Sequence, residues 1–222
     1  LAVIEVKAAE IGAPLFLEGR DWGGRELPPP NLAGPHQRRN AAIAAAALDH
    51  LPGFTVSDEA ITKGFENIDW PARIQHLQSG ALAGILRPDQ ELWLDGGHNP
   101  HAAMMVAETL AGMQDRMERP LFLIAGMLNT KDTDGYFGAF EGMVRHVFTV
   151  PITDSDAGVD PEVLADSAGR AGLTAQPMKS VEEVLRLLGE GWNRLEPAPR
   201  VLIGGSLYLA GQILRLNAQL PD

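Results

Sequence analysis

The sequence contains no cysteine, which excludes disulfide bonds, zinc–thiolate sites and a cysteine nucleophile. It has no uninterrupted apolar run of about 18 residues, so we expect no membrane-spanning helix and no membrane partner. The first residues, Leu1–Glu5, lack the basic stretch of a secretory leader. These absences together are typical of a cytoplasmic protein.

Basic residues are few: 18 lysines and arginines stand against 29 aspartates and glutamates, giving a formal net charge of −11. A surface of that sign repels a phosphate backbone, so nucleic acid is not an expected partner. Apolar residues make up 45% of the 222 residues, enough for the core of one large or two modest domains. The chain lacks an initiating methionine, and we expect it to be a segment of a longer protein.

Three catalytic signatures are missing as well. No G-x-x-x-x-G-K-[ST] occurs, so there is no Walker-type phosphate loop, and no G-x-G-x-x-G supports a nicotinamide cofactor. The G-x-S-x-G nucleophile elbow of the α/β-hydrolases is absent too. Any chemistry must therefore come from other junctions of the chain.

The apolar pattern changes near residue 70. Residues 1–70 predict mainly helices, whereas residues 71–222 predict strands alternating with helices, the pattern of an α/β domain with a mostly parallel sheet covered on both faces. The expected helices are 2–11, 35–48, 57–65, 100–112, 133–140, 161–171, 181–188 and 207–216. The expected strands are 14–17, 74–77, 81–86, 91–94, 121–125, 144–150 and 201–203, with a loop at 21–30.

The segment from Leu92 to Pro100 is predicted to join a strand to a helix, and ligands bind where such strands end. A diglycine allows a sharp turn, and Asn99 followed by proline suits a helix start. A helix start alone does not explain Asp95 or His98. A carboxylate at a strand end can accept a ribose hydroxyl, and an imidazole beside the turn can reach a ligand.

Two further junctions have the same character. Gly204-Gly205-Ser206 precedes a predicted helix, where backbone N–H groups bind anions, and Ser206 either caps that helix, binds a carboxylate ligand, or does both. Lys131 and Asp132 follow the predicted strand 121–125. They are either a solvated loop pair or part of a site.

Two residues outside these junctions are also candidates. Asn40 lies at a helix start just before an alanine-rich stretch, where asparagine is less favourable than alanine, so it either has a polar partner or lies on a solvated face. Arg73 lies at the domain boundary, where an arginine forms a salt bridge or clamps a phosphate.

These residues fall in four segments that resemble the folylpolyglutamate synthase/dihydrofolate synthase family of Mur-type ATP-dependent ligases. Residues 32–37, Leu-Ala-Gly-Pro-His-Gln, with Asn40-Ala41-Ala42 resemble a helix of the family's central domain. Trp70-Pro71-Ala72-Arg73-Ile74-Gln75 is similar to W-P-G-R-x-Q, with alanine for glycine. Residues 94–103 resemble L-D-G-A-H-N-P-H-A-A with Gly97 for alanine, and residues 204–209 resemble T-G-S-L-Y-L.

The resemblance implies a fold and a domain organisation. Residues 1–70 would be the mainly helical C-terminal remnant of a central ATP-binding domain. Residues 71–222 would be the Rossmann-like glutamate ligase domain. Family members carry the phosphate loop, the magnesium ligands and the pterin pocket in an N-terminal part, which would be this chain's partner in cis.

The resemblance also implies an activity: ATP-dependent addition of L-glutamate to dihydropteroate or a folate through an acyl phosphate, in one-carbon metabolism. ATP and Mg²⁺ would be required, with no metal ligand expected in this chain. Asn40, Arg73 and Asp95 would contact ATP. His98, as a catalytic and substrate-binding residue, and Ser206 would lie near the incoming glutamate. The isolated chain would be inactive.

Two other interpretations remain open. The chain could be a stand-alone α/β domain that binds glutamate or a nucleotide without catalysis, and an upstream coding sequence with a phosphate loop would exclude this. It could also be a domain of a peptidoglycan Mur ligase. The pair of H-Q…N-A-A and D-G-x-H-N-P-H-A-A segments favours the folate branch.

Overall fold

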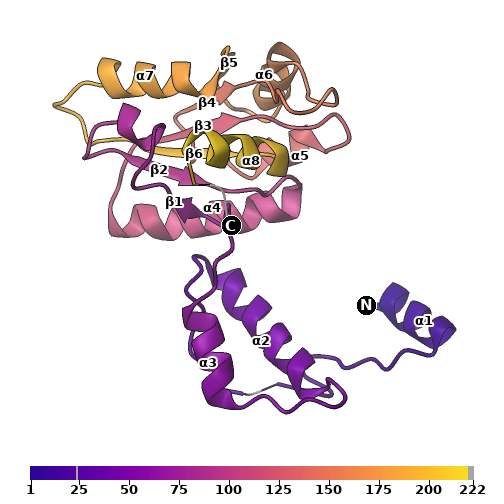
Figure 1. Cartoon of the computed structure of the whole chain (residues 1–222). Helices are drawn as coiled ribbons and strands as arrows, with labels where there is room; N and C mark the ends of the chain where they lie inside the picture. The colour runs from indigo at the N-terminus through magenta and orange to yellow at the C-terminus, as the bar shows by residue number, and fades with distance from the viewer. Residues whose placement is uncertain (24, 220–222) are drawn as a thin grey trace. The chain divides into compact units, whose positions relative to one another are not determined.

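The computed structural model describes residues 1–23 and 25–219, which form two compact units (Figure 1). Unit 1 comprises Leu1–Asn31 and His36–Ile68, and unit 2 comprises Leu32–Pro35 together with the chain from Asp69 onward. Among the described residues, no helix has both the length and the apolar character that a membrane span requires.

Unit 1 is helical, with α1 over Ala2–Ile11, α2 over Pro35–Asp49 and α3 over Asp58–Glu66. Ser57 caps α3 by accepting the Ala60 N–H at 3.2 Å, as the sequence predicts. The buried apolar cluster of this unit is small and comprises Ala45, Ile61 and Phe65.

The strand expected over residues 14–17 is wrong. The Leu17 N–H donates to Asp21 Oδ2 at 2.8 Å, and the Leu17 carbonyl accepts the N–H groups of Arg20 and Asp21. Local bonds of this kind compete with strand pairing, and the segment forms a turn closed by a single bridge between Glu18 and Trp22. Of the predicted loop 21–30, Gly24 lies outside the described residues.

Unit 2 contains a six-stranded sheet in the order β1-β2-β6-β3-β4-β5, which confirms the mostly parallel arrangement. Only β1 is antiparallel to its neighbour; every other pair is parallel. The strands are Gln75–His76 (β1), Glu91–Leu94 (β2), Leu121–Ala125 (β3), His146–Thr149 (β4), Ala175–Pro177 (β5) and Arg200–Gly204 (β6).

Helices cover both faces of this sheet, as predicted, and α7 and α4 lie on opposite sides of it in Figure 1. Successive strand residues point to opposite faces. Leu92 and Leu94 therefore pack with α7 and α8, whereas Trp93 packs with α4, α5 and α6. The helices are Pro100–Arg116 (α4), Thr133–Gly138 (α5), Pro161–Arg170 (α6), Val181–Gly191 (α7) and Leu207–Leu216 (α8).

The strand expected over residues 81–86 is wrong as well, because the chain forms a short 3₁₀ helix, η1, at Ala83–Ile85. Asn217 Oδ1 accepts the N–H groups of Leu82 and Ala83 at 2.9 and 3.2 Å, which fixes the start of this turn. Leu82 and Leu86, one turn apart, are both buried in the core on the α7 face.

Strand β5 was not predicted from the sequence. It has three residues, includes Pro177, and is largely exposed at the edge of the sheet, so it shows no apolar alternation. The expected helix 133–140 ends earlier, at Gly138, and the expected strand 144–150 is limited to the four residues of β4.

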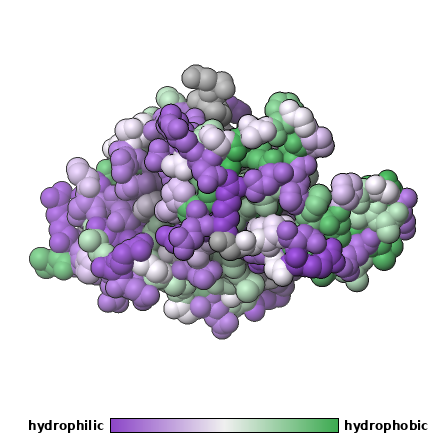
Figure 2. All heavy atoms as spheres, turned by 90° about the horizontal axis from the view of Figure 1, so that it is seen from below, coloured by the Kyte–Doolittle hydropathy of each residue, from purple (hydrophilic) through white to green (hydrophobic). Residues whose placement is uncertain are grey.

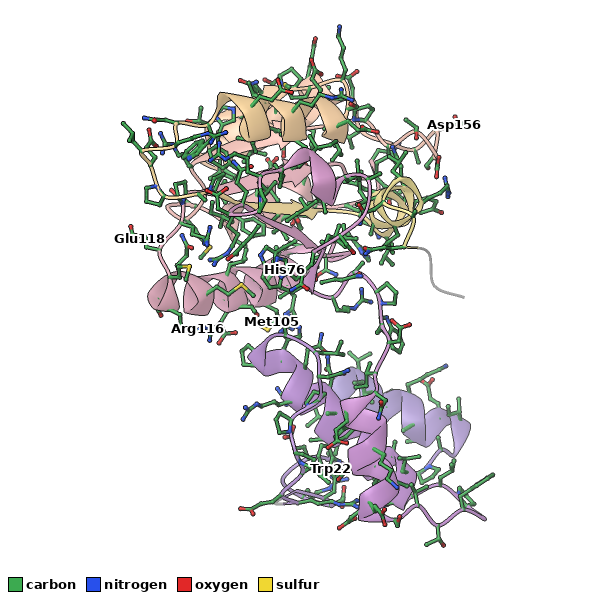
Figure 3. The ribbon with its side chains drawn as sticks, turned by 60° about the vertical axis from the view of Figure 1, so that its left-hand side comes forward. Trp22, His76, Met105, Arg116, Glu118 and Asp156 are labelled. Carbon is green, nitrogen blue, oxygen red and sulfur yellow. The ribbon has the colours of Figure 1, made fainter. Side chains whose placement is uncertain are left out.

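The short strand β1 is held against β2 by an aromatic pair. The rings of His76 and Trp93 stack with centroids 4.3 Å apart and planes 10° apart, and burial lowers the pKa of His76. Figure 3 shows His76 beside the helix that carries Met105 and Arg116. This contact fixes the point where the linker from unit 1 enters the sheet.

Candidate functional site

Three strand-to-helix junctions meet at the carboxyl edge of the sheet, because β2, β6 and β3 are neighbours in it. The Gly126 N–H donates to the Gly204 carbonyl at 3.3 Å, and the Gly205 N–H donates to the Gly97 carbonyl at 3.2 Å. The segments 95–100, 126–132 and 204–206 thus form one connected site, which we call the carboxyl-edge site.

Asp95 lies at the base of this site, only 7% exposed. Its Oδ2 accepts the Ile74 N–H at 2.9 Å, and its Oδ1 accepts the Gly97 N–H at 2.6 Å. The carboxylate therefore connects the end of β2 both to the turn that follows it and to the linker that precedes β1.

The linker residues 72–74 have an unusual backbone. Ala72 and Ile74 have φ angles of 57° and 47°, in the left-handed region that residues other than glycine seldom adopt. The Ala72 carbonyl accepts both the Gly96 N–H at 2.9 Å and a guanidinium N–H of Arg73 at 3.0 Å. Arg73 is thereby held beside the turn after β2, as part of the carboxyl-edge site.

His98 lies half-buried on the same turn. Its Nδ1 is 3.1 Å from the Gly96 carbonyl, which can only accept, so Nδ1 carries the proton of the neutral ring. Nε2 is then the nitrogen available as an acceptor. Asn99 caps α4 by accepting the Ala102 N–H at 2.9 Å, and Pro100 begins that helix, as predicted.

Ser206 is buried and caps α8, with its Oγ accepting the Tyr208 N–H at 3.1 Å. The hydroxyl keeps its own proton for a further contact. The preceding Gly205 has a φ of 97°, and a Cβ there would lie 2.9 Å from Met127 Cγ and 3.0 Å from the Gly126 carbonyl oxygen. Only glycine fits this position without displacing the neighbouring junction.

This packing gives a testable consequence. We expect Gly205→Ala to lower the free energy of unfolding by about 1–3 kcal/mol, since it combines a strained φ with a close contact. Gly211→Ala in α8 is the matched control, because a Cβ there meets nothing within 4 Å. That control should be neutral or more stable by up to about 1 kcal/mol. Urea unfolding of both variants tests this, and equal stabilities would contradict it.

Tyr136 of α5 is a buried residue of this site that the sequence did not single out. Its hydroxyl lies where a Cβ on Gly204 would come within 2.7 Å. Burial, and secondarily the charge of Asp95, raise its pKa, so the phenol stays protonated. Nothing in the sequence around Tyr136 marks it as a site residue. Its position beside Gly204 results from the packing of α5 on the sheet.

Of the remaining predicted residues, Asp132 caps a helix of unit 2 and Asn40 lies on a helix of unit 1. Asp132 caps α5 by accepting the Gly135 N–H at 2.9 Å, which explains half of the Lys131–Asp132 pair as a helix start. Asn40 is exposed on α2, in unit 1, and donates to Gln37 Oε1 at 3.1 Å. Asn40 is thus the one predicted site residue that does not belong to unit 2.

Metal binding finds no support in the described parts of the chain. No group of three or more histidine and carboxylate side chains there is placed to hold an ion. No such cluster among the described residues lies at the carboxyl-edge site. The carboxyl-edge site instead combines a guanidinium, an imidazole and helix-start N–H groups, which suit anionic ligands.

Glycine-rich strand ends, a half-buried arginine and helix starts gather at one edge of this α/β domain, the edge at which sheets of this kind commonly bind ligands. Residues 85–207 match the family model described as Mur ligase, glutamate ligase domain. Since this match covers more than half of the chain, the chain belongs to that family.

A relative from Halobacterium salinarum, named a probable bifunctional folylpolyglutamate synthase/dihydropteroate synthase, is 30% identical over 217 residues. That alignment covers 95% of this chain and 23% of the relative. The curated relative is therefore a much longer protein than the segment that matches it.

Two solved structures have the same fold. Folylpolyglutamate synthase of Mycobacterium tuberculosis, complexed with ADP and AMPPCP, matches with a TM-score of 0.80 and 22% identity over 100% of this chain and 53% of that one. The bifunctional folylpolyglutamate synthase/dihydrofolate synthase of Yersinia pestis, complexed with AMPPNP and a Mn ion, matches with a TM-score of 0.74 and 25% identity over 96% and 50%. The chain spans about half of each.

Proposed function

We propose that this chain is part of an ATP-dependent amide ligase that adds L-glutamate to dihydropteroate, to folates, or to both. Its family membership and the names of its relatives support this activity. The observation that carries the proposal is the joining of three strand ends into one site that includes Arg73 and His98, side chains whose chemistry suits an anionic ligand.

In the proposed reaction a carboxylate oxygen of the acceptor attacks the γ-phosphorus of ATP, and ADP leaves. The glutamate amine then attacks the acyl phosphate carbonyl, loses a proton, and inorganic phosphate leaves as the amide forms. Positioning and charge stabilisation dominate such phosphoryl chemistry. Mg²⁺ would neutralise phosphate charge, and we expect its ligands in a part of the protein that precedes this chain.

The residues divide between the two ligands. Asn40, Arg73 and Asp95 make up the nucleotide side, with the Arg73 guanidinium suited to bidentate phosphate contacts. His98 and Ser206 make up the glutamate side. Nε2 of the neutral His98 ring can accept a proton from the glutamate ammonium group, which leaves the free amine to attack. The Ser206 hydroxyl can donate to a glutamate carboxylate beside the first N–H groups of α8.

Unit 1 supports the proposed domain organisation, in which residues 1–70 complete a larger ATP-binding domain. None of the α1 residues is buried, although most are apolar, and Val3 is 82% exposed. Figure 2 shows hydrophobic surface gathered over this helix, at the right of the view. Apolar surface of this extent marks an interface, and we propose that the preceding part of the same polypeptide covers it.

The proposal is tested with the complete protein and with this chain alone. The complete protein should form the amide from ATP, L-glutamate and either dihydropteroate or tetrahydrofolate, offered as competing acceptors and detected by mass spectrometry. This chain alone should be inactive. If neither acceptor is extended, the proposed activity is wrong; if UDP-sugar peptides are extended instead, the peptidoglycan branch replaces it.

A further inference from the structure

Strand β1 is the shortest strand of the sheet, with the two residues Gln75 and His76, and it pairs with β2 alone. It runs antiparallel to β2, and just beyond it the Leu77 N–H donates to the Leu92 carbonyl at 2.8 Å. A strand with so few backbone bonds belongs to the least stable part of a sheet. Side-chain contacts must therefore contribute to holding it in place.

One such contact is the stack of His76 on Trp93, residues that lie directly opposite each other in the two strands. The half-buried rings have centroids 4.3 Å apart and planes 10° apart. Cross-strand pairs of this kind are the unit that stabilises an antiparallel sheet. The indole is itself fixed, because its Nε1 donates to Glu91 Oε2 at 3.0 Å. The imidazole of β1 thus packs on a ring that β2 holds in one orientation.

The hydrogen bond to this imidazole requires its neutral form. Gln78 Nε2 lies 3.1 Å from His76 Nδ1, and an amide nitrogen can only donate, so Nδ1 accepts and the ring carries its proton on Nε2. A protonated imidazole has a proton on both nitrogens and cannot accept this bond. The contact with Gln78 therefore favours the neutral ring.

Burial also favours the neutral ring, and it is the largest influence on the pKa of His76, which lies below its ordinary value of 6.5. The Glu91 carboxylate acts in the opposite direction, but Arg200 counteracts it and pairs with it at 2.6 Å. The positive charge of a protonated His76 would therefore meet a carboxylate that is already paired.

The other charged groups around β1 are paired or exposed. Arg87, Asp89 and Arg119 line the groove beside His76, where Arg87 pairs with Asp89 at 3.3 Å and Arg119 pairs with Glu91 at 3.1 Å. On α4, which Figure 3 shows beside His76, the titratable side chains are all exposed: His101, Glu108, Asp115 and Arg116. Burial and the bond from Gln78 are therefore the influences that decide the state of the ring.

We propose that His76 and Trp93 form a pH-sensitive clasp: the neutral imidazole holds β1 on β2, and protonation of the ring releases β1 together with the linker that precedes it. Gln75 Oε1 accepts the Ala72 N–H at 2.9 Å, so a side chain of β1 itself joins the strand to the linker. This device goes beyond the proposed ligase activity, and its tests need no turnover.

Proton linkage gives the direction of the effect. Closed β1 binds a proton on His76 less readily than open β1, in which the ring is solvated. The clasp therefore contributes its full stability above about pH 6.5, and this contribution is lost as the pH falls below the ordinary histidine value.

Hydrogen exchange in the complete protein tests the clasp at the Leu77 N–H, which bonds to β2. The protection factor of this amide should fall by about threefold or more between about pH 7.5 and about pH 5. The control is the Val159 N–H, which donates to the Met127 carbonyl at 2.8 Å in a loop pair that contains no histidine, and it should show no such fall. Protection at Leu77 that is unchanged or higher at the acid pH would overturn the proposal.

His76→Phe is the matched variant, because phenylalanine keeps an aromatic ring over Trp93 and does not titrate. Its protection at Leu77 should be the same at both pH values. If that protection falls as it does in the unmodified protein, acid acts on another group and the proposed clasp is wrong.

A direct titration keeps the test decisive if His76→Phe does not fold. The ring protons of His76 in the unmodified complete protein, followed by NMR, should titrate below pH 6.5. Titration at or above this value would mean that closed β1 binds the proton at least as well as open β1, and acid could then not release the strand.

Discussion

Replacing Arg73 by alanine in the complete protein is expected to lower kcat/KM for ATP by about 100- to 1,000-fold, the loss typical of one preorganised charge-stabilising donor. The guanidinium is half-buried, and its one described hydrogen bond goes to the Ala72 carbonyl. A guanidinium has five N–H donors, so those that the Ala72 carbonyl does not engage can bind a ligand.

Two controls separate this role from a general loss of charge. Arg73→Lys keeps the charge but cannot make two parallel hydrogen bonds, so it should recover only part of the activity. Arg186→Ala, at an exposed arginine of α7 far along the chain from the site, should leave the kinetics unchanged. If the KM for ATP is the same in Arg73→Ala as in the unmodified protein, the proposal that Arg73 binds the nucleotide is wrong.

The largest effect on stability is expected at the opposite edge of the sheet, where Glu91 pairs with Arg200. Arg200 is buried, with its side chain 4% exposed, and its Nε donates to Glu91 Oε2 at 2.6 Å. Glu91→Ala leaves this guanidinium without its counter-charge. We expect the free energy of unfolding to fall by about 3–5 kcal/mol, as for other buried pairs that lose one partner.

The control for this change is Glu190→Ala, at an exposed glutamate of α7, which should stay within about 0.5 kcal/mol. Combining Glu91→Ala with Arg200→Met should cost less than the sum of the two single changes, because no buried charge then remains unpaired. Chemical denaturation measures all four variants. Gln114 also accepts a hydrogen bond from Arg200 Nη1, at 2.6 Å. A loss below about 1 kcal/mol in Glu91→Ala would show that this bond is enough to stabilise the buried guanidinium without Glu91.

The same pair predicts a pH dependence. Burial by itself raises the pKa of Glu91, but hydrogen bonds from Arg200 and Trp93 outweigh it and hold that pKa below its ordinary value of 4.5. A depressed carboxyl pKa contributes stability above the ordinary value, and this contribution is lost as the pH falls through the folded-state pKa. The stability difference between Glu91→Ala and the unmodified protein should therefore shrink below about pH 4.

The candidate site could be predicted in part from residue types. Asn99, Pro100 and Ser206 act where local rules place them, because capping depends on residues within one helical turn. The sequence marks Asp95 and Arg73 as candidates, but it does not reveal how the structure connects them. The contact between Asp95 and the Ile74 N–H joins residues 21 positions apart, and nothing in the local sequence specifies it.

The errors in the predicted fold have the same origin. The apolar pattern of residues 81–86 suits a strand, but Asn217, far along the chain, accepts the N–H groups of Leu82 and Ala83 and turns the segment into η1. Strand β5 lies at an exposed edge and is defined only by its pairing with β4, so its sequence shows no alternation of apolar and polar residues that would predict a strand.

The sequence by itself determined the α/β class, the mostly parallel sheet and the three strand-to-helix junctions, because hydrophobic periodicity, glycines and caps act over a few residues. Only the tertiary structure decided that β6 lies between β2 and β3, so that the three junctions form one site. It also decided that Tyr136 is buried beside Gly204 and that Ala72 and Ile74 are held in a left-handed linker. Those features depend on strand order and on contacts between distant segments, which packing of the whole domain selects.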